Sequence, residues 1–266
     1  TAVQERGVKY ISTRTIGADH IDLTAAKELG LKVCNSNYAP NGVADYTVML
    51  ILLSLRKYKP ALWRAQVNDY SLAGLQGREL RNLTVGILGT GKIGAAVIKN
   101  LSGFGCRILA SDIRENPSLK GLCTYVDNET LYKECDIISL HMPLLESTRH
   151  FVNAETIARM KDGVTIINCA RGELMNIPDM IRGIETQKIG ALALDVFDKE
   201  DGIYHENRRD DIISNRDMAY LRQFPNVIMT QHMAFYTDAA VQSMVFCGIE
   251  GLCDFAKTGH TETELV

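Results

Sequence analysis

The stretch Thr84-Val85-Gly86-Ile87-Leu88-Gly89-Thr90-Gly91-Lys92-Ile93-Gly94 decides the fold of this chain. An apolar strand runs into the pattern G-x-G-x-x-G, and a helical pattern follows. In a dinucleotide-binding βαβ unit, the first glycine allows the tight turn, the second lets the backbone approach a pyrophosphate, and the third lets helix and strand pack closely. The helix N-terminus presents N–H groups and a positive dipole end to the phosphates. Gly89, Gly91 and Gly94 therefore predict a nucleotide site, with an ordinary β-turn-α corner as the alternative.

The next apolar run, residues 108–110, leads to Asp112. A carboxylate at the tip of the second strand can accept hydrogen bonds from both ribose hydroxyls and repels a 2′-phosphate. Asp112 therefore favours NAD over NADP as the cofactor.

Bulk composition describes an ordinary globular protein. The chain has 266 residues, 46% of them hydrophobic and 23% charged, with a formal net charge of −3. This net charge lacks the positive excess expected of a protein that binds nucleic acid or an anionic membrane. The longest strongly apolar stretch, residues 48–55, is too short to span a bilayer. Seven cysteines without a C-x-x-C pair favour a reducing cytoplasm, and no His/Cys cluster has the spacing of a metal site. We therefore expect no nucleic acid, membrane or metal partner.

The start of the chain, which lacks an initiator Met, suggests that upstream residues are missing.

Apolar runs alternate with helical patterns along the whole chain, which is typical of a doubly wound α/β fold with a parallel sheet. Residues 198–218 are polar and irregular, as expected of a segment that covers or shapes a site. Strands are predicted at residues 8–13, 31–35, 84–88, 108–110, 137–140, 164–168, 191–195 and 227–230. Helices are predicted at residues 23–29, 44–58 (with Pro60 interrupting or kinking it), 128–134, 154–160, 177–185 and from 237 or 238 to 255.

Polar residues follow the ends of four of these strands. His141 and Asp195 come directly after apolar runs, with Glu200 shortly after Asp195, and Arg171 and His232 come within three residues of a predicted strand end. Ligands of open α/β sheets bind beyond the carboxyl ends of the strands, so acid, base and cation are expected beside the nucleotide.

Hydride transfer to or from a nicotinamide needs a cation for the substrate carboxylate and a proton donor or acceptor. Arg171 is the natural cation because its planar fork binds carboxylates bidentately. His232 is the natural acid/base, and Glu200 could stabilise its imidazolium form and fix its tautomer. Taken singly, Arg171 could instead cap a helix, Glu200 could be a solvated loop acid, and His232 could be a satisfied core histidine.

Seven stretches of the chain resemble the D-isomer-specific 2-hydroxyacid dehydrogenases, most closely the D-lactate dehydrogenase branch that includes the vancomycin-resistance type. They are TRTIGADHID (13–22), NYAPNGVADY (37–46), VGILGTGKIG (85–94), HMP (141–143), INCARG (167–172), DVFDKE (195–200) and TQHMAFYT (230–237). The resemblance implies that Arg171, Glu200 and His232 form the catalytic triad. Gln231 and Met233 depart from the proline and threonine usual beside the catalytic histidine.

The resemblance also implies two domains, a Rossmann-type NAD-binding domain at residues 38–235 and a smaller flavodoxin-like substrate domain at 1–37 and 236–266 that lacks its N-terminal part. Substrate would contact Ile16, Gly17, Tyr38, Arg171 and Phe235. The cofactor-binding residues would be Gly89, Gly91, Lys92, Ile93, Gly94, Asp112, Met142, Pro143, Thr148, Cys169, Ala170 and Asp195, with Asp195 near the carboxamide.

We therefore predict that the protein is a cytoplasmic NAD-dependent dehydrogenase that reduces a small 2-keto acid. The leading reaction is the reduction of pyruvate to D-lactate. A dehydrogenase for a larger acid, such as 2-hydroxyisocaproate or 2-hydroxyglutarate, and an NAD-sensing corepressor-like binding protein are the alternatives. A homodimer is also expected. The helix after Asn41, with Val48, Ile51, Leu52 and Leu55, could be the dimer face or simply pack in the core.

Overall fold

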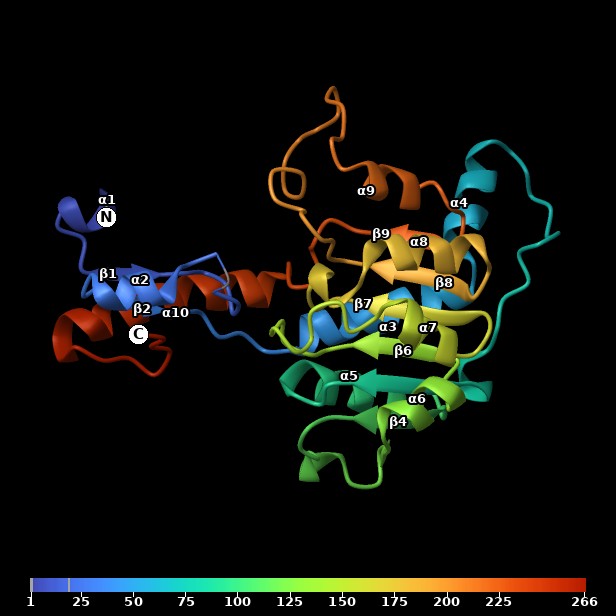
Figure 1. Ribbon diagram of the computed structural model, residues 1–266, viewed down its shortest axis with the longest axis horizontal. Helices are drawn as coiled ribbons and strands as arrows, with labels where there is room; N and C mark the ends of the chain where they lie inside the picture. The colour runs from blue at the N-terminus through green and yellow to red at the C-terminus, as the bar shows by residue number, and fades with distance from the viewer. Residues whose placement is uncertain (1, 19) are drawn as a thin grey trace. The chain divides into compact units, whose positions relative to one another are not determined.

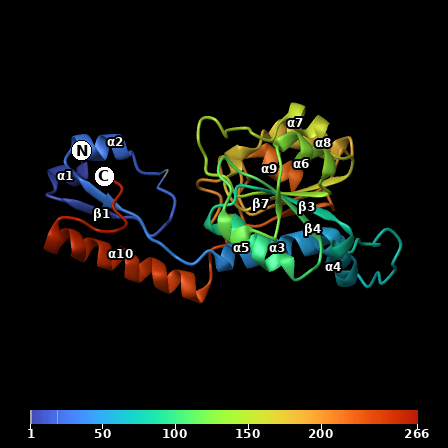
Figure 2. The same ribbon diagram turned by 90° about the horizontal axis from the view of Figure 1, so that it is seen from below.

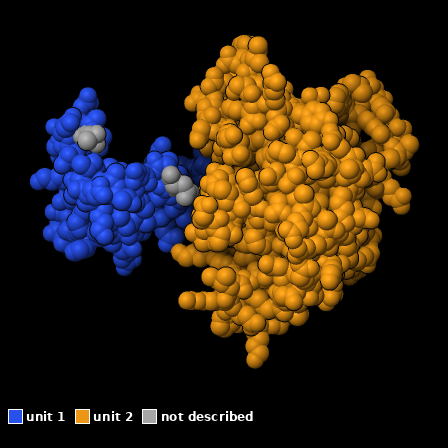
Figure 3. Space-filling model, in the orientation of Figure 1, with its two compact units in different colours: residues 1–42, 235–266 blue, residues 43–234 orange. Residues whose placement is uncertain are grey.

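The computed structural model describes residues 2–18 and 20–266, so Asp19 of the stretch 13–22 lies outside the described residues. The chain divides into two compact units, residues 1–42 with 235–266 and residues 43–234 (Figure 3). The functional division expected from the sequence, with boundaries at 37/38 and 235/236, stays a prediction.

The larger unit is built on a seven-stranded sheet in the order β5-β4-β3-β6-β7-β8-β9, and every pairing is parallel (Figure 1). Its strands are β3 (Thr84–Leu88), β4 (Arg107–Ser111), β5 (Thr124–Tyr125), β6 (Ile137–Leu140), β7 (Val164–Asn168), β8 (Ile189–Leu194) and β9 (Val227–Met229). The chain winds outward from β3 in one direction through β4 and in the other through β6. A crevice for ligands forms at such a reversal point, at the carboxyl ends of the strands.

Helices cover both faces of this sheet. Figure 2 shows α3 (Asn41–Leu55) and α5 (Lys92–Ser102) on one face, and α6 (Asn128–Glu134), α7 (Ala154–Arg159) and α8 (Ile177–Glu185) on the other. Because both faces are covered, strands β6 and β7 are buried at every position, as expected of a parallel sheet. The predicted doubly wound α/β fold is thus confirmed.

The smaller unit contains a two-stranded parallel sheet of β1 (Tyr10–Ser12) and β2 (Lys32–Cys34), joined by α2 (Leu23–Glu28), with α1 (Ala2–Glu5) before it. The C-terminal helix α10 (Asp238–Thr258) packs on these strands through small residues and one aromatic ring. A Cβ on Gly251 would lie 2.7 Å from Cys34 Sγ, and the rings of Tyr10 and Phe255 stack at 5.5 Å.

Among the described residues, α10 has the length and apolar composition to cross a membrane, although less than a third of its most apolar window is buried. Such a composition in one helix is weak evidence, since core helices share it. A helix was predicted here from residue 237 or 238 to 255, whereas the stretch expected to be the longest strongly apolar one, residues 48–55, lies in α3.

The helix predicted for residues 44–58 ends earlier than expected, at Leu55. A second helix, α4 (Tyr58–Gln66), begins after Lys57, whose backbone is left-handed with φ of 49°. Pro60 lies in the first turn of α4, where a missing N–H costs no helical hydrogen bond. Pro60 therefore does not kink the first helix, because it belongs to the next one.

The apolar residues Val48, Ile51 and Leu55 of α3 are buried in the core, and Leu52 is half-buried. Of the two alternatives for this helix, core packing therefore explains its apolar face.

The elements α1, β5 and α9 (Arg216–Leu221) were also not anticipated from the sequence, and α9 begins inside the segment expected to be irregular. Asn215 caps α9 by accepting a hydrogen bond from the Met218 N–H. An asparagine before a helix is a recognisable start signal, so α9 could have been found.

Candidate active site

The glycine loop joins β3 to α5 at the reversal point of the sheet. Gly89 has φ of 94°, and a Cβ there would lie 2.7 Å from the carbonyl carbon and oxygen of His141. A Cβ on Gly94 would overlap the carbonyl oxygen of Gly89. A Cβ on Gly91 would meet nothing within 4 Å. Two glycines are thus required by packing within the protein, while the third leaves open space beside its backbone.

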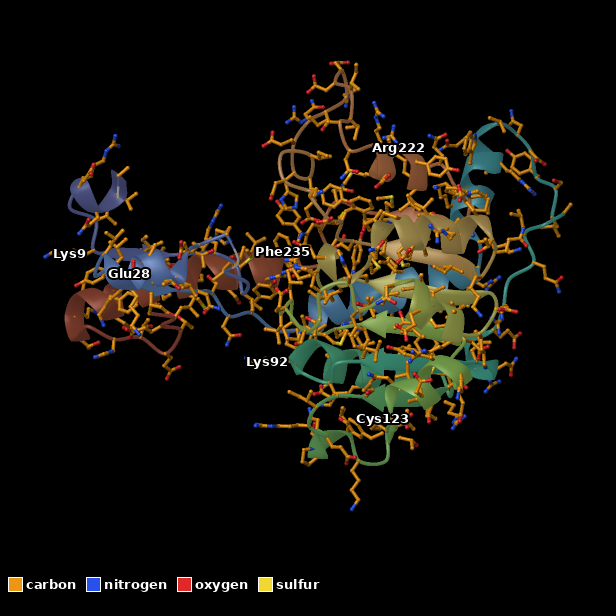
Figure 4. The ribbon with its side chains drawn as sticks, viewed as in Figure 1. Lys9, Glu28, Lys92, Cys123, Arg222 and Phe235 are labelled. Carbon is orange, nitrogen blue, oxygen red and sulfur yellow. The ribbon has the colours of Figure 1, made fainter. Side chains whose placement is uncertain are left out.

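Helix α5 begins directly after this loop, with Gly91 as its N-cap and Lys92 as its first residue (Figure 4). Ile93 follows in the same first turn, and no side chain caps this end. The first N–H groups of the helix therefore point toward the open space at Gly91, an arrangement suited to anions.

Asp112 follows β4 and lies against the glycine loop. Its carboxylate accepts hydrogen bonds from the backbone N–H of Thr90 at 2.5 Å, the Thr90 hydroxyl at 3.0 Å and the Arg114 N–H at 3.2 Å. Burial alone would raise the pKa of Asp112, but these hydrogen bonds outweigh it and the net pKa is lowered. The carboxylate is therefore charged at neutral pH.

The segment after β6 lies beside the glycine loop, where the His141 N–H donates to the Leu88 carbonyl at 2.7 Å. The Thr148 hydroxyl donates to the Pro143 carbonyl at 2.7 Å and closes the turn that follows Met142. Burial lowers the pKa of His141 to about 4, so its imidazole is neutral at physiological pH. His141 is therefore a poor candidate for the proton donor.

After β7, a fully buried asparagine shapes the loop that carries Arg171. Asn168 Oδ1 accepts the Ala170 N–H at 2.9 Å, and its Nδ2 donates to the Arg171 carbonyl at 2.8 Å. A Cβ on Gly172 would overlap the backbone of Phe197, so this loop packs directly on the segment after β8. Burial raises the pKa of Cys169 to about 12, which keeps it a thiol and removes it as a nucleophile.

Asp195 is fully buried at the end of β8, and its carboxylate holds the turn after β9. It accepts hydrogen bonds from the Thr230 hydroxyl at 2.6 Å, the Met233 N–H at 2.9 Å and the Ala234 N–H at 2.8 Å. Its own carbonyl accepts the N–H of His232 at 2.7 Å. The buried carboxyl group is thus hydrogen-bonded to the turn that presents His232.

Glu200 and His232 form the tightest side-chain pair of the site. His232 Nδ1 lies 2.5 Å from Glu200 Oε1, and Glu200 Oε2 accepts the Phe197 N–H at 2.7 Å. A carboxylate can only accept, so Nδ1 of His232 carries a proton. Both side chains are partly exposed, at 31% for His232 and 22% for Glu200. This pair therefore holds a hydrogen-bonded, partly exposed imidazole at the carboxyl edge of the sheet.

Within the smaller unit, the rings of Tyr38 and Phe235 lie 6.5 Å apart. The carbonyl of Ile16 accepts the Asn35 side-chain amide at 2.7 Å, and that of Gly17 accepts the Thr15 hydroxyl at 2.6 Å. Of the four predicted substrate residues in this unit, the structure therefore brings Tyr38 and Phe235 together and fixes the backbone at Ile16 and Gly17.

Sequence reasoning missed the residues that support this site. Asn168, Thr230 and Gly172 lay inside quoted motifs but received no role, although a polar residue at the end of an apolar strand is a detectable signal. His205, which contacts the backbone of His232, lies in the irregular segment and had no signal at all. Among the described residues, no group of three or more His, Cys, Asp and Glu side chains could hold a metal ion.

Comparison with known proteins agrees with this geometry. Residues 48–234 match the model of the D-isomer specific 2-hydroxyacid dehydrogenase, NAD binding domain. The chain is 44% identical to an aromatic 2-oxoacid reductase of Clostridium sporogenes (99% of this chain, 80% of the relative). It is 40% identical to a D-specific alpha-keto acid dehydrogenase of Enterococcus faecium (98% and 80%). A D-lactate dehydrogenase structure from Sporolactobacillus superposes with a TM-score of 0.88 at 35% identity (99% and 80%).

The fold and these matches define an NAD-dependent oxidoreductase. The chain belongs to the D-isomer-specific 2-hydroxyacid dehydrogenase family, which confirms the resemblance seen in its motifs.

Proposed function

We propose that this protein reduces a small 2-oxo acid, pyruvate first, to the D-2-hydroxy acid with NADH. The observation that carries the proposal is the 2.5 Å contact between His232 Nδ1 and Glu200 Oε1, at the sheet edge that also holds the glycine loop. The relative named as a D-specific alpha-keto acid dehydrogenase and the similar D-lactate dehydrogenase structure support this substrate class.

Bound NADH supplies the hydride that reaches the carbonyl carbon of the substrate. His232 Nε2 donates the proton to the carbonyl oxygen, because Nδ1 is engaged by Glu200. Glu200 stabilises the imidazolium and keeps the ring in this orientation. Arg171 binds the substrate carboxylate and polarises the carbonyl, a role suited to its planar fork of donors.

The remaining predicted residues serve binding. Asp112 accepts hydrogen bonds from the adenosine ribose and sets the preference for NAD, while Gly91 and the first turn of α5 receive the pyrophosphate. Substrate is held by Ile16, Gly17, Tyr38 and Phe235 together with Arg171. The other cofactor contacts proposed are Gly89, Lys92, Ile93, Gly94, Met142, Pro143, Thr148, Cys169, Ala170 and Asp195.

A larger substrate is the second candidate, because one relative of this chain is named an aromatic 2-oxoacid reductase. The departures Gln231 and Met233 flank His232, where they could alter side-chain preference.

The experiment that tests this function is NADH oxidation with a panel of pyruvate, 2-oxoisocaproate, phenylpyruvate and 2-oxoglutarate, followed by chiral analysis of the product. We expect the highest kcat/KM with pyruvate and a D-configured product. A preference for phenylpyruvate would select the second candidate. An L-configured product, or NADH binding without turnover of any 2-oxo acid, would contradict the proposal.

We also propose a cytoplasmic homodimer. Support for a protein partner comes from the exposed apolar side chains of α4 and the loop after it: Tyr58, Leu62, Trp63, Val67, Tyr70 and Leu72. Such a patch is larger than isolated exposed residues on a monomer, and it is typical of an interaction surface.

A further inference from the structure

The backbone of His232 adopts a conformation that side-chain-bearing residues rarely take. Its φ is 53°, in the left-handed region, and Lys199 and His205 have φ of 57° and 64°. Non-glycine residues persist there where the surrounding contacts hold them, and such residues gather at functional sites. The orientation of the His232 ring therefore depends on what holds this turn.

The N–H groups of the turn are held by Asp195, as described above. The backbone carbonyl of His232 is held by a different residue. Its oxygen lies 3.1 Å from Nε2 of His205. A carbonyl oxygen can only accept a hydrogen bond, so His205 Nε2 carries a proton and donates it.

The segment that carries His205 is itself anchored on Glu200. The N–H groups of Ile203 and Tyr204 both lie 3.0 Å from the Glu200 carbonyl oxygen and donate to it. The Tyr204 ring packs against the hydrophobic core, so the residue before His205 is fixed. One short segment thus contacts His232 twice, through the Glu200 carboxylate at Nδ1 and through the His205 ring at the carbonyl oxygen.

We propose that His205 is a positioning residue for proton transfer. By donating from Nε2 to the His232 carbonyl, it holds the left-handed backbone that directs the His232 imidazole toward Glu200 and toward the substrate. This inference rests on the proposed function, in which His232 supplies the proton.

The residue is suited to a clean test because it is exposed, so its replacement removes little buried surface. We compare His205→Leu with His205→Gln. Both replacements are unbranched at Cβ and share the strain of a φ of 64°, but glutamine retains an N–H donor near the position of Nε2. His150→Leu is the matched control, since His150 has φ of 53° and lies in the turn before α7.

His205→Leu is expected to lower kcat with pyruvate about 10- to 100-fold, the loss that a small misplacement of a catalytic group causes. KM, the dissociation constant of NADH and the thermal unfolding midpoint should stay close to wild type. His205→Gln should recover most of the lost kcat, and His150→Leu should behave as wild type. Wild-type kcat in His205→Leu, or a His205→Gln variant as slow as His205→Leu, would overturn the inference.

Proton NMR of the 15N-histidine-labelled protein separates this result from failure of the proposed function. The Nδ1 proton that His232 shares with Glu200 should resonate far downfield in wild type and His205→Gln, and should move or broaden in His205→Leu. If wild type reduces no 2-oxo acid, the proposed function fails and this resonance alone decides the role of His205. An unchanged resonance in His205→Leu would then overturn it.

Discussion

Replacing His232 with asparagine should reduce kcat for 2-oxo acid reduction by about 10²- to 10⁴-fold, the range that general acid–base groups contribute. Asparagine is the right replacement because His232 has φ of 53°, and asparagine tolerates the left-handed region better than alanine does. NADH binding should be nearly unchanged, since the proposed nucleotide site is at the glycine loop and Asp112. Steady-state kinetics and fluorescence titration with NADH measure the two quantities.

His150→Asn is the control for this change, because His150 has the same φ of 53°. It should retain wild-type kcat and NADH affinity. A His232→Asn enzyme with near-wild-type kcat would contradict the acid/base role, and a loss confined to NADH affinity would reassign His232 to cofactor binding.

Gly94→Ala should have the largest effect on stability. Its new Cβ would overlap the carbonyl oxygen of Gly89, and a Cβ–backbone overlap inside a tight β-turn-α unit has no flexible side chain to yield. We expect a loss of about 1–3 kcal/mol in the free energy of unfolding, the usual size for overpacking, together with weakened NADH binding. Chemical denaturation followed by circular dichroism measures the first effect.

Gly91→Ala separates stability from binding. A Cβ there meets nothing within 4 Å and φ is −63°, so the apo protein should be as stable as wild type. Its methyl group would fill the space proposed for the pyrophosphate, so NADH affinity should fall. Equal NADH affinity in Gly91→Ala and wild type would refute this location for the pyrophosphate, and wild-type stability in Gly94→Ala would refute the packing argument.

Much of the fold was predictable because its signals are local. The run from Thr84 to Gly94 contains strand, turn and helix start in sequence, and the strands β6 and β7 are mostly apolar and buried at every position. The ends of β7, β8 and β9 also indicated Arg171, Asp195 and His232. Strand order could then be inferred from the rules of parallel α/β sheets.

Other features depend on contacts that sequence spacing does not encode. The break between α3 and α4 requires a left-handed Lys57, a conformation that no residue type there demands. The Asp195 carboxylate accepts three hydrogen bonds from the turn around His232, which lies more than thirty residues further along the chain. His205 reaches that turn from a loop without periodicity, so its contact emerges only after folding.

The pairing of Glu200 with His232 is the central claim, and pH–rate profiles of wild type and Glu200→Gln test it most directly. Reduction requires the imidazolium, so its rate should fall as pH rises; oxidation requires neutral imidazole and should rise over the same interval. The Glu200 charge stabilises the imidazolium, so in Glu200→Gln both midpoints should move to lower pH. The rate should also fall, because one amide oxygen cannot accept from both His232 Nδ1 and the Phe197 N–H. Profiles with the same midpoints in both proteins would contradict the account, since Glu200 would then not act on the proton of His232.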